Sequence, residues 1–262
     1  MPLAKVNGIN INYTVKGYGE PLVMIMGIGG DQSAWKHQIS AFKKHYQVIT
    51  FDNRGVGKSD KPQGSYSPTL MAEDTIQLMD FLKIEKAHIL GMSMGGLIAQ
   101  EIAINYPERI LKLILASTFA RQDNAANGST PEMLAIMELP SKQMINRFLD
   151  ACFNKLFNRF VLIPLIKFQA RRRIKEQELT GIKVQLDSAK SYDSLDRLPL
   201  IKAPTLVLVG TKDRVVKPES SNTIAQKIPN ARLVKIDKGS HLIGWEMGKV
   251  FNKEVLDFLK SM

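Results

Sequence analysis

The sequence predicts an α/β fold in which a mostly parallel sheet carries helices on both faces. Short apolar runs of strand length recur along the chain, and segments with helical periodicity separate them. The runs are continuous rather than alternating, which is typical of strands buried on both faces of a parallel sheet. They lie at 21–27, 46–52, 86–92, 111–118, 204–210 and 231–237, and the helical patterns lie near 31–44, 68–83, 94–105, 218–227 and 245–260.

The chain begins with a different strand pattern. Residues 3–17 alternate between apolar and polar side chains on both sides of Asn7 and Gly8, a dipeptide that tight hairpin turns favour. We therefore expect an antiparallel hairpin at one edge of the sheet.

The alternation of strands and helices stops between residues 119 and 197. Apolar side chains recur there at helical spacing, and Pro164 interrupts the further apolar run 160–166. We expect a helical insertion that forms a lid over a core made of residues 1–118 and 198–262. The apolar stripe either packs only on its neighbours or also lines a pocket; it comprises Met144, Ile145, Phe148, Leu149, Cys152, Phe153, Leu156 and Phe157.

Length and composition restrict the class of protein. The 262 residues suit one enzyme-sized globular unit. The N-terminus lacks a signal-peptide pattern, and no apolar stretch approaches the roughly 20 residues that span a bilayer, so we expect a soluble cytoplasmic protein. The single cysteine, Cys152, excludes an internal disulfide and a cysteine-rich metal site. We expect neither a metal nor a cofactor.

The formal net charge of +11 is spread along the chain rather than gathered in one arm. Only Arg171–Arg173 forms a basic run, and no recognition-helix pattern or aromatic-interleaved basic strand accompanies it. The run therefore favours a solvated helix face over a nucleic-acid or membrane site. Attraction of a carboxylate-bearing substrate is the alternative, and the composition is compatible with a homo-oligomer.

The most informative motif is Gly-Met-Ser-Met-Gly at residues 91–95, where an apolar run ends and an apolar helical pattern begins. Glycines two residues before and two residues after Ser93 allow a sharp strand-to-helix turn, because neighbouring backbone can approach where a Cβ would clash. Such a turn exposes the serine hydroxyl. Ser93 is therefore a candidate nucleophile, and the alternative is an ordinary helix cap.

With this motif and strand order, the chain resembles the α/β-hydrolase fold family, in its group of small esterases, lactonases and carbon–carbon bond hydrolases. The resemblance covers essentially the whole chain and implies the order nucleophile, acid, histidine. Asp213 and His241 occupy the implied positions, each shortly after an apolar run. Because the carboxyl ends of parallel strands open on one side of a sheet, the three loops would converge there. A neutral imidazole can then take the serine proton, and a carboxylate can orient the imidazole.

The resemblance also implies an oxyanion hole made by two backbone N–H groups. One donor would be Met94, the residue after the nucleophile, and the other would be Ile28 in the loop Met-Gly-Ile-Gly-Gly at 26–30. Met26 stands where many members have a histidine, so the side chain that often braces this loop is missing. The turn Asp-Asn-Arg-Gly-Val-Gly-Lys-Ser at 52–59 resembles another family segment; it predicts a buried arginine–aspartate clamp rather than a phosphate site.

These residues predict a cofactor-free serine hydrolase that cleaves a carboxylic ester, or a lactone, of a small and largely apolar substrate. Three alternatives are compatible with the same residues. A lactonase or carbon–carbon bond hydrolase would use the same triad, and a perhydrolase of the cofactor-free haloperoxidase type also carries a methionine after the serine, as Met94 does here. A small-molecule receptor of this fold would keep the triad but turn over slowly.

Overall fold

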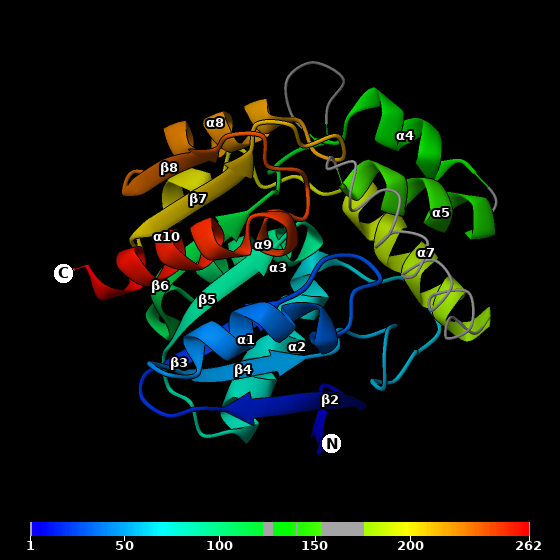
Figure 1. The fold of residues 1–262 in the computed structure, drawn as a ribbon. Coiled ribbons are helices and arrows are strands. Elements are labelled where there is room, and N and C mark those ends of the chain that lie inside the picture. The colour runs from blue at the N-terminus through cyan, green and yellow to red at the C-terminus, as the bar shows by residue number, and fades with distance from the viewer. Residues whose placement is uncertain (1, 123–127, 140, 154–175, 262) are drawn as a thin grey trace.

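A computed structural model describes residues 2–122, 128–139, 141–153 and 176–261 and confirms the predicted fold class (Figure 1). One eight-stranded sheet has the order β1-β2-β4-β3-β5-β6-β7-β8. The pairs β1–β2 and β2–β4 are antiparallel, and every other neighbouring pair is parallel. The strands are β1 (Leu3–Val6), β2 (Ile9–Lys16), β3 (Pro21–Ile25), β4 (Gln47–Phe51), β5 (Ala87–Met92), β6 (Ile110–Ala116), β7 (Thr205–Gly210) and β8 (Ala231–Ile236).

The predicted hairpin is present between β1 and β2, with Val6 opposite Ile9. Asn7 and Gly8 have φ angles of 47° and 77°, as a two-residue turn with both central residues at positive φ requires. Ala4, Val6 and Ile11 point into the core on the α2 side of the sheet.

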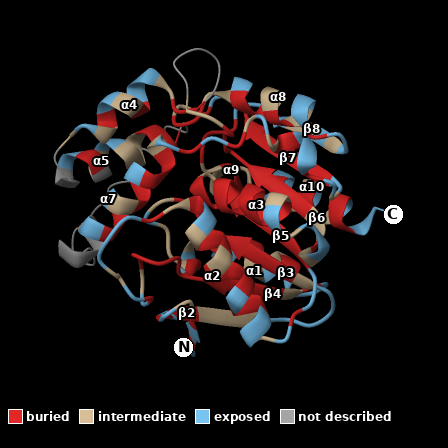
Figure 2. Cartoon of the chain, turned by 180° about the vertical axis from the view of Figure 1, so that it is seen from behind, coloured by how far each residue is buried: buried red, intermediate tan, exposed pale blue. Residues whose placement is uncertain are grey.

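Helices cover both faces of the sheet (Figures 1 and 2). One apolar cluster joins the sheet to α1 (Lys36–Phe42) and α10 (Gly248–Lys260) through Trp35, Phe42 and Phe251. A second cluster, on the other face, joins it to α2 (Pro68–Phe81), α3 (Met94–Asn105) and α8 (Pro218–Lys227). The short helices η1 (Gln32–Trp35), η2 (Pro107–Arg109), η4 (Leu198–Leu200) and α9 (Ile243–Glu246) lie in the connections.

The expectation that every apolar run is buried on both faces is wrong for the last strand. In β8 only Ile236 is buried, while Arg232 and Lys235 are exposed. The reason is its position, because β8 pairs only with β7 and ends the sheet. Edge strands with charged side chains also resist pairing with another chain.

Between β6 and β7 the described chain is largely helical. It forms α4 (Pro131–Met137), α5 (Ser141–Cys152) and α7 (Glu176–Lys190), which lie together beyond the carboxyl ends of the strands (Figure 1). Cys152 is fully buried, and burial together with the charges of Asp213 and Glu246 raises the pKa of its thiol, which stays protonated. The run 160–166, the triplet Arg171–Arg173, Leu156 and Phe157 lie outside the described residues.

The turn at residues 52–59 holds a buried ion pair, but its acid comes from another element. Arg54 Nε lies 2.6 Å from Oδ2 of Asp74 on α2, and both side chains are almost fully buried. Asp52 instead accepts the backbone N–H of Gln32 at 2.8 Å and of Lys58 at 2.9 Å. The turn is thus a structural junction between the sheet, α2 and η1.

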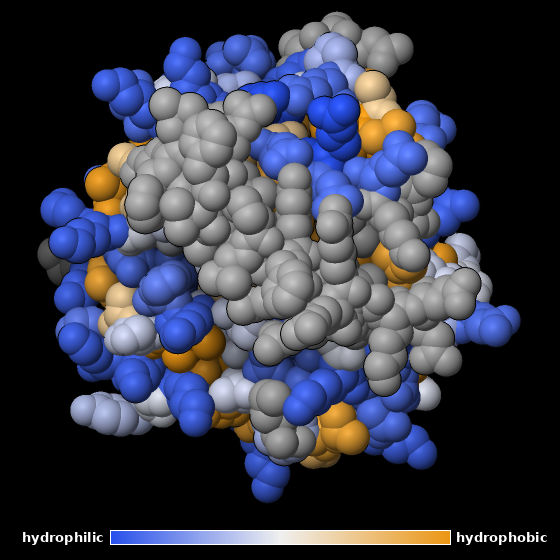
Figure 3. All heavy atoms as spheres, turned by 45° about the vertical axis from the view of Figure 1, so that its right-hand side comes forward, coloured by the Kyte–Doolittle hydropathy of each residue, from blue (hydrophilic) through white to orange (hydrophobic). Residues whose placement is uncertain are grey.

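Hydrophilic side chains dominate the described part of the face in Figure 3, and the hydrophobic ones appear in small separate groups. In the part of the chain that the structure describes, no helix has the length and apolar character needed to cross a bilayer. The same part contains no group of three or more histidine, cysteine, aspartate or glutamate side chains placed to hold a metal ion.

Candidate active site

Ser93 occupies the sharp turn between β5 and α3. Its backbone angles, φ 55° and ψ −123°, fall in a region that non-glycine residues rarely adopt. Two hydrogen bonds tie it to the end of β6 and the residues that follow: the Ser93 N–H donates to the carbonyl of Ala116 at 2.9 Å, and Thr118 Oγ1 donates to the carbonyl of Ser93 at 2.8 Å. The strain is therefore maintained by β6 and the residues that follow it.

The glycines around Ser93 allow the backbone segments to approach closely. A Cβ on Gly91 would collide with the carbonyl of Gly95, and a Cβ on Gly95 would collide with the carbonyl of Ile25. A Cβ on Gly27 would lie 2.9 Å from Cβ of Ser93. Only glycine fits at positions 91 and 95, because the obstacles there are backbone atoms.

Asp213 and His241 are in direct contact. His241 Nδ1 lies 2.8 Å from Asp213 Oδ2, and both side chains are buried. Oδ1 of Asp213 accepts the N–H groups of Val215 at 2.8 Å and Val216 at 3.0 Å, which fixes the carboxylate. An Nδ1–H that donates to the carboxylate leaves Nε2 of the ring available as a proton acceptor.

Ser93 and His241 line one cavity of about 330 Å³. Within the described residues no hydrogen bond joins Ser93 Oγ to His241, whose ring bonds to Asp213. In enzymes such serine–histidine bonds are often long until substrate is bound. The other lining residues are mostly apolar: Met26, Gly27, Ile28, Gly29, Gly30, Ala34, Met92, Met133, Met144, Phe148, Leu149, Phe153, Ile182, Leu186, Leu242 and Trp245. The apolar stripe thus lines a pocket as well as packing, through Met144, Phe148 and Leu149 of α5 and through Phe153 just after it.

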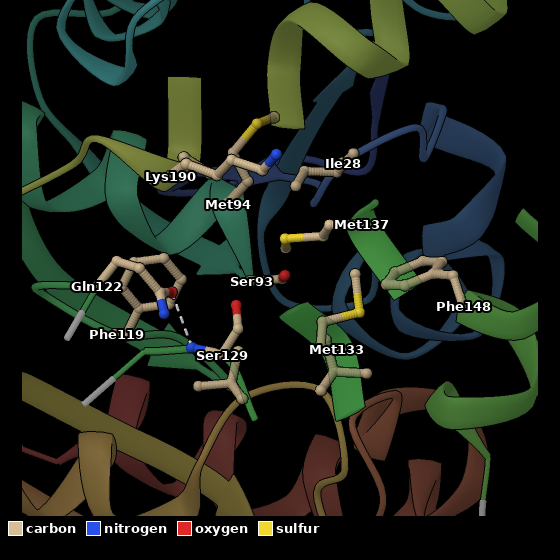
Figure 4. A pocket seen from close by; sticks show the side chains of 13 residues that line it. Ile28, Ser93, Met94, Phe119, Gln122, Ser129, Met133, Met137, Phe148 and Lys190 are labelled. Carbon is tan, nitrogen blue, oxygen red and sulfur yellow. Dashed lines mark hydrogen bonds between the residues drawn. The ribbon is translucent and has the colours of Figure 1, made fainter. Parts of the chain in front are cut away.

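A second, much smaller cavity of about 20 Å³ also reaches Ser93 (Figure 4). Phe119, Met137 and Val216 are among its walls, together with the polar side chains of Gln122, Ser129 and Lys190. In Figure 4 the Ser129 hydroxyl points toward Ser93, and the Ser129 N–H donates to Gln122 Oε1 at 2.9 Å.

Ile28 and Met94, the two candidate oxyanion donors, both border this smaller cavity beside Ser93. Met94 is the first residue of α3, so its N–H has no acceptor within the helix. The Ile28 N–H has no hydrogen-bond acceptor among the residues that the structure describes. Neither N–H group thus has an acceptor among the described residues.

Two side chains that the sequence did not single out brace the loop at 26–30. Asn53 Nδ2 donates to the carbonyl of Met26 at 2.9 Å. Gln185 on α7 accepts the Gly29 N–H at 3.0 Å and donates through Nε2 to the carbonyl of Arg54 at 2.8 Å. These contacts support the loop although Met26 replaces the usual histidine. In the sequence, only its polar character on the apolar side of a helical pattern sets Gln185 apart.

Replacing Gln185 by leucine is expected to lower the free energy of unfolding by about 1–2 kcal/mol, because the Gly29 N–H and the buried Arg54 carbonyl lose their partners. Urea denaturation followed by circular dichroism measures this change. Lys183→Leu, at an exposed position of the same helix, is the matched control and should leave stability within about 0.5 kcal/mol. Equal stability of both variants would contradict the bridging role of Gln185.

Comparison with known proteins agrees with the architecture. The profile of the family described as "alpha/beta hydrolase fold" matches residues 20–247. BpoC of Mycobacterium tuberculosis, whose name places it provisionally among non-heme bromoperoxidases, is 33% identical over 97% of this chain and 99% of its own. RutD of Azorhizobium caulinodans, named provisionally as a carbamate hydrolase, is 28% identical over 98% of each chain. The solved enol-lactonase from Burkholderia xenovorans LB400 superposes with a TM-score of 0.87 at 29% identity, covering 99% of this chain and 100% of that one.

Proposed function

Because this chain belongs to the α/β-hydrolase fold family, we propose that it is a serine hydrolase that cleaves carboxylic esters of small, largely apolar substrates. The observation that carries the proposal is the buried pair of Asp213 and His241, 2.8 Å apart, which borders the same cavity as the strained Ser93. A serine, a histidine and a buried carboxylate in this relation form the machinery of acyl transfer.

In the proposed reaction, Ser93 Oγ bonds to the ester carbonyl carbon while its proton passes to Nε2 of His241. The N–H groups of Ile28 and Met94 stabilise the negative charge on the carbonyl oxygen. The carbon–oxygen bond to the alcohol then breaks, and the alcohol oxygen takes the proton from His241. Water attacks the acyl-enzyme by the same route and releases the acid and free Ser93.

We further propose that residues 119–197 act as a lid. Helices α4, α5 and α7 of this segment contribute Met133, Met144 and Leu186 to the wall of the cavity, opposite the sheet. Apolar lining of this kind excludes water from the reacting groups and favours an apolar ligand.

A lactonase is the second candidate, because the enol-lactonase structure matches this chain over its full length. A lactone is an internal ester, and the same residues would open it with the alcohol still attached to the acyl group. Parallel assays of nitrophenyl esters and lactones distinguish the two substrates. Peroxide-dependent halide oxidation in acetate buffer tests the perhydrolase activity suggested by the likeness to BpoC.

A fluorophosphonate probe tests the serine mechanism directly. We expect the wild-type protein to gain the mass of one probe, which peptide mapping locates at Ser93. Asp213→Asn should slow labelling by about 10³–10⁴-fold, because the imidazole loses its correct tautomer. Asp193→Asn, which removes a surface partner of Arg121, is the matched control and should label at the wild-type rate. Labelling at another residue would overturn the proposal.

A further inference from the structure

Two unequal cavities meet at Ser93, and they share only part of their walls. Ile28, Ser93, Met133 and Phe148 border both. His241 borders the cavity of about 330 Å³ but is not among the residues that line the cavity of about 20 Å³. The surroundings of Ser93 are therefore asymmetric in size and in access to the histidine.

This asymmetry indicates which cavity would hold the alcohol half of an ester and which would hold the acyl half. The proton that leaves His241 must reach the alcohol oxygen, so the alcohol half lies in the cavity that His241 borders. The carbonyl oxygen lies at the N–H groups of Ile28 and Met94. The remaining substituent of the carbonyl carbon, the acyl chain, then extends into the smaller cavity, which Met94 borders and His241 does not.

We propose, on the basis of the serine hydrolase function above, that the substrates are esters of a short acyl group with a bulky apolar alcohol. A cavity of about 20 Å³ holds little more than one water-sized group, which corresponds to the methyl of an acetyl ester. A cavity of about 330 Å³ is within the range of small-molecule sites. The larger side therefore admits an aromatic or medium-length alkyl alcohol.

The walls of the smaller cavity oppose a longer acyl chain. The N–H of Val216 donates a hydrogen bond to Asp213, and Phe119 is buried against the core. Neither residue can therefore easily move outward to enlarge the cavity. An alkyl chain that passed between them would meet the polar side chains of Gln122, Ser129 and Lys190. Lys190 Nζ is already bound to Glu138 at 3.2 Å. Apolar methylenes would gain little by displacing these groups.

Two substrate series test the assignment in the wild-type protein. With the alcohol fixed as p-nitrophenol, kcat/KM should fall by about 100-fold from acetate to octanoate, because added methylenes overfill the smaller cavity. With the acyl group fixed as acetate, kcat/KM should rise by at least about tenfold from the ethyl to the 2-(2-naphthyl)ethyl ester, whose alcohols are both primary and leave with similar ease. Preference for octanoate over acetate would overturn the assignment while leaving the serine mechanism intact.

A matched pair of methionine variants separates the two sides. Met137 borders only the smaller cavity, and Met144 borders only the larger one. Met137→Ala should raise the ratio of hexanoate to acetate turnover by about tenfold. Met144→Ala should leave this ratio within about twofold and change the selectivity among acetate esters instead. The reverse result would overturn the assignment; if no ester is hydrolysed and Ser93 is not labelled, the proposed function itself fails.

Discussion

Alanine in place of Ser93 is expected to lower kcat for p-nitrophenyl acetate by about 10⁴-fold or more, because no other group supplies the attacking oxygen. A small residual rate should persist, since the N–H groups of Ile28 and Met94 still stabilise the charged carbonyl oxygen. Initial rates at saturating substrate, with the purified variant at high concentration, measure the loss. Retention of more than about one-tenth of the wild-type kcat would overturn the nucleophile assignment.

Stability measurements on the same position separate chemistry from folding. Ser93→Ala should leave the free energy of unfolding within about 0.5 kcal/mol, because Ser93 Oγ makes no hydrogen bond among the described residues. Ser93→Gly should raise the free energy of unfolding by about 1 kcal/mol, because glycine adopts φ 55° without strain. The larger conformational entropy that glycine loses on folding offsets only part of this gain. An inactive but more stable glycine variant would show that the turn stores strain for the exposed serine.

Gly95→Ala is expected to have the largest effect on stability, with a loss of about 3 kcal/mol or more in the free energy of unfolding. The added Cβ would collide with the carbonyl of Ile25 and lie 2.9 Å from that of Met26. Backbone atoms cannot move aside by changing a rotamer, so β3 or α3 must shift. Because Met26 begins the loop that carries Ile28, ester turnover should fall as well. Urea denaturation and initial rates measure both effects.

Gly248→Ala is the matched control for this clash. Gly248 is also near the start of a helix, but the nearest atom to an added Cβ is Gln38 Nε2 at 4.0 Å. Alanine is a better helix former than glycine, so this variant should be as stable as the wild type or more stable by up to about 1 kcal/mol. If both variants lost stability equally, the close approach of α3 to β3 would not be the cause.

Much of the fold followed from local pattern. The continuous apolar runs predicted the parallel strands, and Asn7–Gly8 predicted the hairpin turn that the structure contains. The one error, complete burial of β8, arose because an apolar run indicates a strand but not its position in the sheet. An edge position depends on which strands pair, and that is a property of the whole chain.

In the candidate site, too, some residues could be predicted from the sequence and others were found only through their tertiary contacts. Ser93 was identified from a turn motif, and Asp213 and His241 from the residue order that the resemblance to the α/β-hydrolase fold family implies. The chain direction of a parallel sheet sends the loops that carry them to one edge. Gln185 and Asn53 carried no comparable signal. Each acts through a contact with a segment distant in sequence, from Gln185 to Gly29 and from Asn53 to Met26.

By itself, the sequence determined the order of the elements and the sharp turn at Ser93, because local spacing encodes periodicity, turn geometry and strand direction. Its resemblance to the α/β-hydrolase fold family supplied Asp213 and His241 as candidates. Only the tertiary structure decided how much space surrounds Ser93 on each side. Those two volumes result from residues of the loop after β3, the β6–α4 connection, α4, α5 and α7 meeting in three dimensions. The packing of such distant segments leaves no pattern along the chain.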